Sequence, residues 1–144
     1  MFETLSGGPW WDTSTEFEKK AQNLISSFGI QSKNPKAKII NMGDFNDNPK
    51  DISIKPTLLT TSNKLKTKKN ELYNPTEELF KRGYGTYKYR GKWDMIDQFM
   101  ISKGLLNNSG LFFLKADVFN EKYLINPEGK YEGYPYKSFA GGKY

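Results

Sequence analysis

Residues Lys36 to Pro49, KAKIINMGDFNDNP, place a short apolar run directly before a cluster of small polar residues. The run Ile39–Met42 is short and rich in isoleucine, which predicts a buried strand that breaks at Gly43. Asp44 and Asn46 follow at the C-terminal mouth of this strand. A carboxylate and an amide at this spacing can reach the same ligand atom, and open α/β sheets usually bind ligands at that edge.

Two interpretations of the polar cluster stay open on these residues alone. Glycine, asparagine, aspartate and proline favour turns in any protein, so a strand followed by an Asx-rich turn explains the cluster without any ligand. The same residues also suit a binding site. A second motif of the right kind, farther along the chain, is needed to favour the site over the turn.

The composition restricts the chemistry of the chain. Its 144 residues include no cysteine and no histidine, which excludes disulfides, thiolate ligands, histidine ligands and histidine acid–base catalysis within it. Any metal must then be a hard cation on oxygen ligands. The length and an aromatic content of 15% favour one folded domain. No apolar run approaches the roughly 20 residues that span a bilayer.

Charge gives a weaker indication. The net charge of +6 suits an anionic partner, such as a phosphate ester or nucleic acid, and equally serves solubility. Lysines are frequent in the polar stretch 60–70, which is predicted to be an exposed loop. No basic start or apolar core of a signal peptide is seen, and the compartment is left open.

Capping residues and helical spacing predict two helices. The first spans Ser14–Phe28 and should end at Gly29. The second begins at Asn74-Pro75, carries acidic residues in its first turn and ends at Gly83. The apolar run Leu111–Leu114 predicts a further strand.

The second informative stretch is WDMIDQFMIS, from Trp93 to Ser102, which is strand-like and mostly apolar. Side chains alternate in a strand, so Asp97 shares a face with Phe99 and Ile101. A buried carboxylate without a partner costs on the order of several kcal/mol. Asp97 is therefore expected either to have a structural hydrogen-bond partner or to face a site.

Together these motifs resemble the endonuclease/exonuclease/phosphatase superfamily, the DNase I-like metal-dependent phosphoesterases. Gly43 to Asn46 matches its Gly-Asp-Phe-Asn signature, and Ile96 to Ser102 is similar to its Ile-Asp-Tyr strand, with Gln98 replacing the usual aromatic residue. Gly85 to Tyr87 resembles the Gly-Thr-Tyr entry of the preceding hairpin. The order and spacing agree over nearly the whole chain.

The resemblance implies roles for four residues. Asp44 would orient or activate the attacking water and contribute to a metal site, Asn46 would hold a phosphate oxygen, and Asp97 would support the site from the neighbouring strand. Thr86 would contact the substrate. The implied cofactor is Mg²⁺ or Mn²⁺, and the implied reaction is hydrolysis of a phosphate ester.

The resemblance also implies an α/β fold, as part of the family's four-layer α/β sandwich. Residues 1–144 match the C-terminal half of the family domain and are expected to be incomplete at both ends, without the glutamate that is the main metal ligand and without the closing Ser-Asp-His strand. The expected function is that of a metal-dependent phosphoesterase that is inactive as this chain alone.

The alternative is a non-catalytic module that binds nucleic acid through the lysines of 64–69 and the aromatic residues Tyr87, Tyr89 and Trp93. Expected partners are a phosphate-ester substrate or nucleic acid, with no membrane span. Self-association through an exposed sheet edge is also expected.

Overall fold

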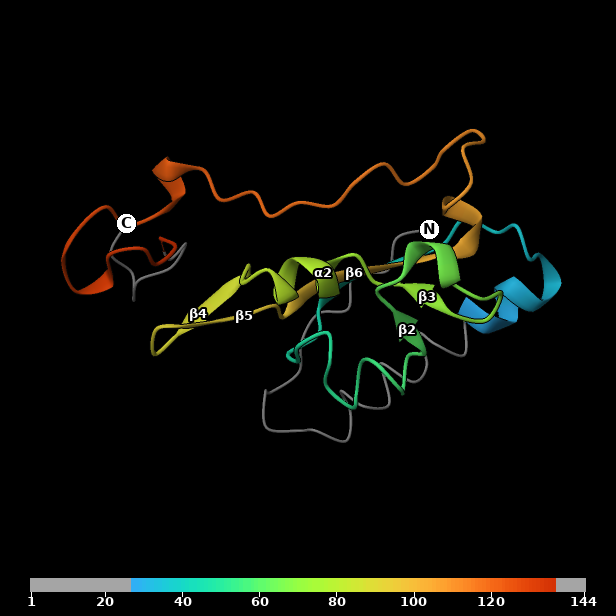
Figure 1. Cartoon of the computed structure of the whole chain (residues 1–144), viewed down its shortest axis with the longest axis horizontal. Coiled ribbons are helices and arrows are strands. Elements are labelled where there is room, and N and C mark those ends of the chain that lie inside the picture. Colours follow the sequence, from blue (N-terminus) through green and yellow to red (C-terminus); the bar gives the residue numbers. More distant parts are fainter. Residues whose placement is uncertain (1–26, 137–144) are drawn as a thin grey trace.

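The computed structural model describes residues 27–136, which contain a four-stranded sheet and several short helices (Figure 1). The strand order is β1-β6-β3-β2, with bounds Ile40–Asp44 for β1, Asp97–Ser102 for β6, Leu72–Tyr73 for β3 and Thr60–Thr61 for β2. Strand β6 is antiparallel to β1 and to β3, whereas β2 runs parallel to β3. The expected α/β class is confirmed, because the described residues combine helices with a sheet.

The remaining elements are a separate two-stranded sheet and several short helices. A hairpin of β4 and β5 projects away from the four-stranded sheet in Figure 1. The bounds are Tyr87–Tyr89 for β4, Lys92–Asp94 for β5, Thr76–Lys81 for α2, Lys64–Lys66 for η1, Lys103–Leu105 for η2, Lys122–Leu124 for η3 and Gly129–Tyr131 for η4. In the described part of the chain, no helix has the length and apolar character needed to cross a membrane.

Each face of the sheet packs against its own cluster of apolar side chains. On one face, Met100 of β6 and Leu72 of β3 are fully buried. They form a cluster with the buried side chains of Phe45, Ile54 and Leu58. On the other face Ile101 and Tyr73 pack with Leu105, and three partly buried side chains, Phe99, Leu106 and Phe113, lie against them. Burying one such aliphatic side chain contributes about 1.5–3 kcal/mol, so both clusters hold β6 at the centre of the sheet.

Strand β1 differs from the prediction. It does not break at Gly43 but continues to Asp44, and its side chains are largely exposed, with Ile40 at 47% and Met42 at 68%. Within residues 27–136 its paired neighbour is β6, so β1 lies at the edge of the sheet. The apolar run correctly indicated a strand, but an edge position leaves one flank without the cover that burial requires.

Two further expectations need correction, and part of one lies outside the described residues. The predicted helix 14–28 begins before residue 27, but residues 27–33 are helical, so the chain passes through Gly29 without ending the helix. Ser27 and Gln31, one helical turn apart, are both buried, and this packing continues the helix past the glycine.

The segment Leu111–Leu114 is not a strand, although the backbone N–H of Phe113 donates to Leu105 O at 2.7 Å.

Helix α2 begins at Thr76, one residue later than its sequence predicts, with Pro75 instead of Asn74 at the N-cap. The Asn74 side chain accepts a hydrogen bond from the backbone N–H of Thr76 at 3.1 Å, and Pro75 occupies the position where a missing N–H costs nothing. Gly83 follows the helix with a φ of 89°, a left-handed conformation that glycine adopts without strain.

Candidate active site

Asp44 and Asp97 lie directly opposite each other across the β1–β6 pair. Asp44 is the last residue of β1 and Asp97 is the first residue of β6. Opposite residues of an antiparallel pair point to the same face, with Cβ atoms about 4.5–5.5 Å apart. The register therefore brings two carboxylates, 53 positions apart in the chain, to one end of the sheet.

Both carboxylates are exposed. The expectation that Asp97 shares a buried face was wrong at this position, because the pairing ends here and solvent reaches the end of the strand. Exposure lowers the cost of placing two like charges together, because water screens them. An exposed carboxylate pair of this kind is suited to attract a cation.

Asn46 lies in the turn that leaves β1. Its backbone N–H donates to Asp44 Oδ1 at 2.9 Å, and its φ is 53°. Asparagine is one of the few residues that adopt this left-handed conformation readily. The turn therefore orients the Asp44 carboxylate through the Asn46 backbone, as the Asx-rich sequence favours.

Thr86 is connected to Asp97 through the backbone. Its Oγ1 accepts a hydrogen bond from the Asp97 N–H at 3.0 Å, and its own N–H donates to Asp94 O at 2.9 Å. Thr86 thus holds the start of β6 at the point where Asp97 emerges. Because a hydroxyl group also donates, this contact leaves Thr86 able to bind a substrate oxygen.

Two site residues were missed by the sequence interpretation. Asn48 donates through Nδ2 to Asp94 Oδ1 at 2.9 Å and accepts at Oδ1 from the Met95 N–H at 2.8 Å. It therefore holds the turn after β1 against the chain that enters β6. The sequence marked Asn48 only as part of a turn, and no local pattern indicates a partner 46 residues away.

Gln98 is the second missed residue. It is buried, donates through Nε2 to Asp47 O at 2.6 Å and accepts at Oε1 from Asn74 Nδ2 at 2.9 Å. Because Asn74 also caps α2, a chain of buried polar contacts joins that helix to the turn that carries Asn46. In the sequence, the only indication that Gln98 has a special role was that a glutamine replaces the family's aromatic residue at this position.

The donors match a divalent metal in kind but not in number. Carboxylate and amide oxygens suit Mg²⁺, which is usually bound through one or two carboxylates plus waters and substrate oxygens. Across residues 27–136 no cluster of three or more histidine, cysteine, aspartate or glutamate side chains is placed to hold a metal ion. Asp44 and Asp97 therefore fit a weak site that water and substrate must complete.

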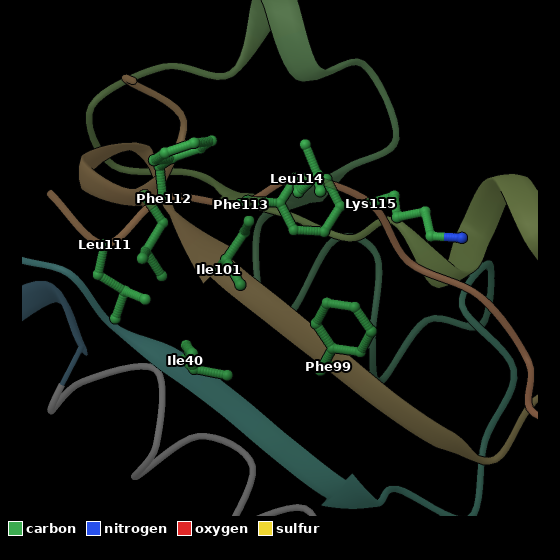
Figure 2. Close-up of a pocket in the computed structure, with 9 residues that line it drawn as sticks. Ile40, Phe99, Ile101, Leu111, Phe112, Phe113, Leu114 and Lys115 are labelled. Carbon is green, nitrogen blue, oxygen red and sulfur yellow. The ribbon is translucent and has the colours of Figure 1, made fainter. Parts of the chain in front are cut away.

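An apolar groove of about 220 Å³ lies farther along the same two strands (Figure 2). Ile40 and Ile101, directly opposite each other, form its floor together with Phe99. The remaining lining residues are Leu105 and the stretch Leu111, Phe112, Phe113, Leu114 and Lys115. None of the four predicted site residues lines this groove, so it is separate from the carboxylate pair.

Comparison with known proteins identifies the family. A family model described as Endonuclease/Exonuclease/phosphatase family matches residues 14–144. No curated protein and no solved structure gives a significant match. The matched range contains both strands of the carboxylate pair, the Asn46 turn and Thr86. Since the model covers most of the chain, the protein belongs to the endonuclease/exonuclease/phosphatase family.

Proposed function

We propose that this chain is a divalent-metal-dependent phosphoesterase domain whose site is built from Asp44, Asn46 and Asp97. The observation that carries the proposal is the register of β1 on β6, with Asp44 opposite Asp97 and the Asn46 N–H bonded to the Asp44 carboxylate. Family membership supports a hydrolytic function of the nuclease or phosphatase type. The proposal adds the residues and the metal dependence.

Each residue has a role that suits its chemistry. Asp44 accepts a hydrogen bond from the attacking water and orients it, and Asn46 donates from its side-chain amide to a phosphate oxygen. Asp97 adds negative charge beside Asp44, while Thr86 holds the Asp97 backbone and donates to the substrate. Mg²⁺ or Mn²⁺, when bound, would polarise a phosphoryl oxygen and stabilise the leaving group. Asp44 is the residue that would hold it.

The chain alone is proposed to have little or no turnover. It contains no histidine, and losing one proton-transfer group typically costs about 10²–10⁴-fold in rate. The donor set at Asp44 and Asp97 is also too small to hold Mg²⁺ tightly. On this proposal residues 1–144 form part of the family's domain, and further ligands come from a segment outside them.

Metal binding by the purified full chain tests the site without relying on turnover. Mn²⁺ binding can be measured through the relaxation of water protons. Asp44→Asn should weaken it by more than the roughly 10–100-fold that losing an outer-shell partner of a metal ligand typically costs. The control is Asp117→Asn, which removes another exposed carboxylate far along the chain and should leave Mn²⁺ binding unchanged. Equal affinity in both variants would overturn the site.

Activity is the second measurement. With Mg²⁺ or Mn²⁺ present, hydrolysis of a chromogenic phosphodiester and of a phosphomonoester by the unmodified chain should not exceed that of the Asp44→Ala variant. Turnover well above this blank would contradict the proposed inactivity, and would support the phosphoesterase function if Asp44→Ala abolishes it.

A non-catalytic nucleic-acid-binding module remains a second candidate function. One observation favours it, namely that Tyr87 and Tyr89 are exposed on a hairpin that also carries basic residues. Trp93, the third aromatic residue considered, is only half-exposed and has Lys88 over its ring, so it is less suited to stacking. Binding of single strands without any metal-dependent phosphate chemistry would favour this candidate.

Self-association is also part of the proposal. Ile40 and Met42 expose apolar surface on β1, which is an edge strand among the described residues. An exposed edge of this kind is a template for pairing with a second chain.

A further inference from the structure

The β4–β5 hairpin has one face that the rest of the described chain leaves open. Tyr87 and Tyr89 both point to this face and are 48% and 54% exposed. Their ring centroids are 6.5 Å apart and their planes differ by only 11°. The two rings are therefore stacked nearly parallel, and together they expose aromatic surface of the kind that is usually buried.

Two cations lie beside Tyr89, and the carboxylate of Asp94 is opposite Tyr87. The Arg90 guanidinium lies 5.3 Å from the centroid of the Tyr89 ring, and Lys92 is directly opposite Tyr89 in the strand register. The Lys92 ammonium group is 3.3 Å from Asp94, but the side chain is 74% exposed. The rings and cations therefore form one open surface, defined here as the tyrosine platform: Tyr87, Tyr89, Arg90 and Lys92.

The opposite face of the hairpin is fixed by the C-terminal part of the described chain. Lys88 lies over the rings of Trp93 and Tyr134 and donates to Gly133 O at 3.1 Å. The Gly91 N–H at the hairpin tip donates to the Tyr134 hydroxyl. The hairpin is therefore held on one side, which gives the tyrosine platform a defined position instead of a freely moving one.

The platform leads directly to the carboxylate pair. Thr86 immediately precedes Tyr87 and accepts the hydrogen bond from the Asp97 N–H, and Tyr87 is opposite Asp94 in the register. At about 3.3 Å per residue, the strand from Thr86 to Arg90 covers ~13 Å. A ligand lying along this strand would end at Asp97 and Asp44.

We propose that the tyrosine platform binds single-stranded nucleic acid and guides one of its phosphodiesters to the Asp44–Asp97 pair. Bases stack on Tyr87 and Tyr89, and the flanking phosphates pair with Arg90 and Lys92. A single strand is required because the faces of paired bases are already stacked within a duplex. This inference rests on the proposed function for its second half only, since strand binding does not need catalysis.

Fluorescence anisotropy of a labelled oligothymidylate with the full chain tests the platform. Tyr87→Ala and Tyr89→Ala should each weaken binding by about tenfold or more, whereas Tyr87→Phe and Tyr89→Phe keep the ring and should bind as the unmodified chain does. The matched control is Tyr123→Ala, which removes a tyrosine that is even more exposed, at 69%, but lies outside the platform, and it should have no effect. Equal weakening by the control and the platform variants would overturn the proposal.

The salt dependence tests the cations. Arg90→Gln and Lys92→Gln should each lower the slope of log affinity against log salt by about 0.7, the value for one phosphate contact on a single strand. Lys122→Gln removes a charge outside the platform. It should lower the affinity less than either platform variant does, and by the same factor for every type of strand. Slopes that are the same in all three variants would contradict phosphate pairing at the platform.

Two further outcomes distinguish strand binding at the platform from the phosphoesterase proposal and from binding to a membrane. Strand binding by the unmodified chain is measured without added metal and needs no turnover, so failure of the phosphoesterase proposal leaves the platform standing, and normal metal binding without any strand binding overturns the platform alone. Vesicles containing phosphatidylserine are the competing ligand for exposed tyrosines beside cations. Binding of vesicles but not of oligothymidylate, with loss in the same tyrosine variants, would assign the surface to a membrane and overturn the proposal.

Discussion

Asn46, whose side chain has a proposed function, adopts a left-handed backbone conformation that most residues avoid. Its φ of 53° costs a residue with a Cβ atom roughly 1–2 kcal/mol, less for asparagine, and nothing for glycine. Such residues persist only where the surrounding structure determines them, here through the bond from the Asn46 N–H to Asp44 and the neighbouring contact of Asp47 O with Gln98. Position 46 therefore couples stability to the geometry of the site.

Two substitutions separate the backbone of Asn46 from its amide. Asn46→Gly and Asn46→Ala both remove the amide and should reduce metal-dependent phosphate binding equally. Asn46→Ala should also lower the free energy of unfolding by about 1 kcal/mol more than Asn46→Gly, because alanine strains the left-handed conformation. Urea unfolding of both variants measures the difference. Equal stabilities would show that the turn relaxes away from this conformation.

Among the elements, α2 shows how tertiary contacts hold a short helix in place. A six-residue helix is too short to be stable alone. Glu77, a residue of this helix, is fully buried. The Glu77 carboxylate lies 2.6 Å from Lys55 Nζ and 3.2 Å from Lys81 Nζ. Asn74 ties the start of the helix to Gln98 in β6. The helix is therefore fastened to the same strand that carries Asp97.

A hydrogen bond in this helix makes a pH-dependent contribution to stability. The bond from Lys81 lowers the pKa of Glu78 from its ordinary value of 4.5, and the same bond raises the pKa of Lys81 from 10.5. The pair therefore stabilises the fold fully at pH values between the ordinary pKa values of the two groups, 4.5 and 10.5. Its contribution is lost as the pH falls through the lowered pKa of Glu78, and again as the pH rises through the raised pKa of Lys81.

Glu78→Gln should accordingly lower the free energy of unfolding by only about 0.3–0.5 kcal/mol near pH 7, since the pair is exposed. The difference from the unmodified chain should shrink as the pH is lowered below 4.5. Urea unfolding across this range measures it. In a Lys81→Gln background the same substitution should have a smaller effect, because only the Ser62 hydrogen bond and the Lys50 charge still lower the pKa of Glu78, and an undiminished effect would contradict the assignment to Lys81.

On the scale of the whole molecule, apolar surface gathers along one face of the β1–β6 pair. Ile40 and Met42 from β1 lie on the same face as the groove residue Phe99, and the exposed side chains of Leu111 and Leu114 lie beside it (Figure 2). The opposite face of the sheet is fully packed around Met100. Among the described residues, one side of this sheet is therefore packed around Met100, whereas on the other side the apolar side chains of β1 lie exposed beside the cluster around Ile101.

We expect the full chain to associate with itself through this face. Met42→Lys should shift sedimentation velocity profiles at micromolar concentration towards the monomer, because a lysine placed between two copies would be desolvated. Leu65→Lys is the control, since Leu65 is 95% exposed on η1 and lies outside the face. A monomer at every concentration, or an equal shift in both variants, would refute this interface.

Local sequence determined those elements whose conformation depends on near neighbours. Asn74-Pro75 lies within two residues of the start of α2, and Gly83, which was expected to end the helix, follows it with a φ of 89°. Proline near the start of a helix and glycine just after its end are favoured by their own backbone preferences, so residue type alone indicates them. The two family motifs likewise identified the residues proposed for the site.

Only the tertiary structure decided what these residues face. The pairing of Asp44 with Asp97, the edge position of β1, the polar link from Asn74 through Gln98 to Asp47 and the irregular path of Leu111–Leu114 all depend on partners far away in the chain. A strand has no internal hydrogen bonds, so its register and burial are set by the segments that pack beside it. Sequence periodicity records that a strand can form, whereas non-local contacts determine which of its faces is covered.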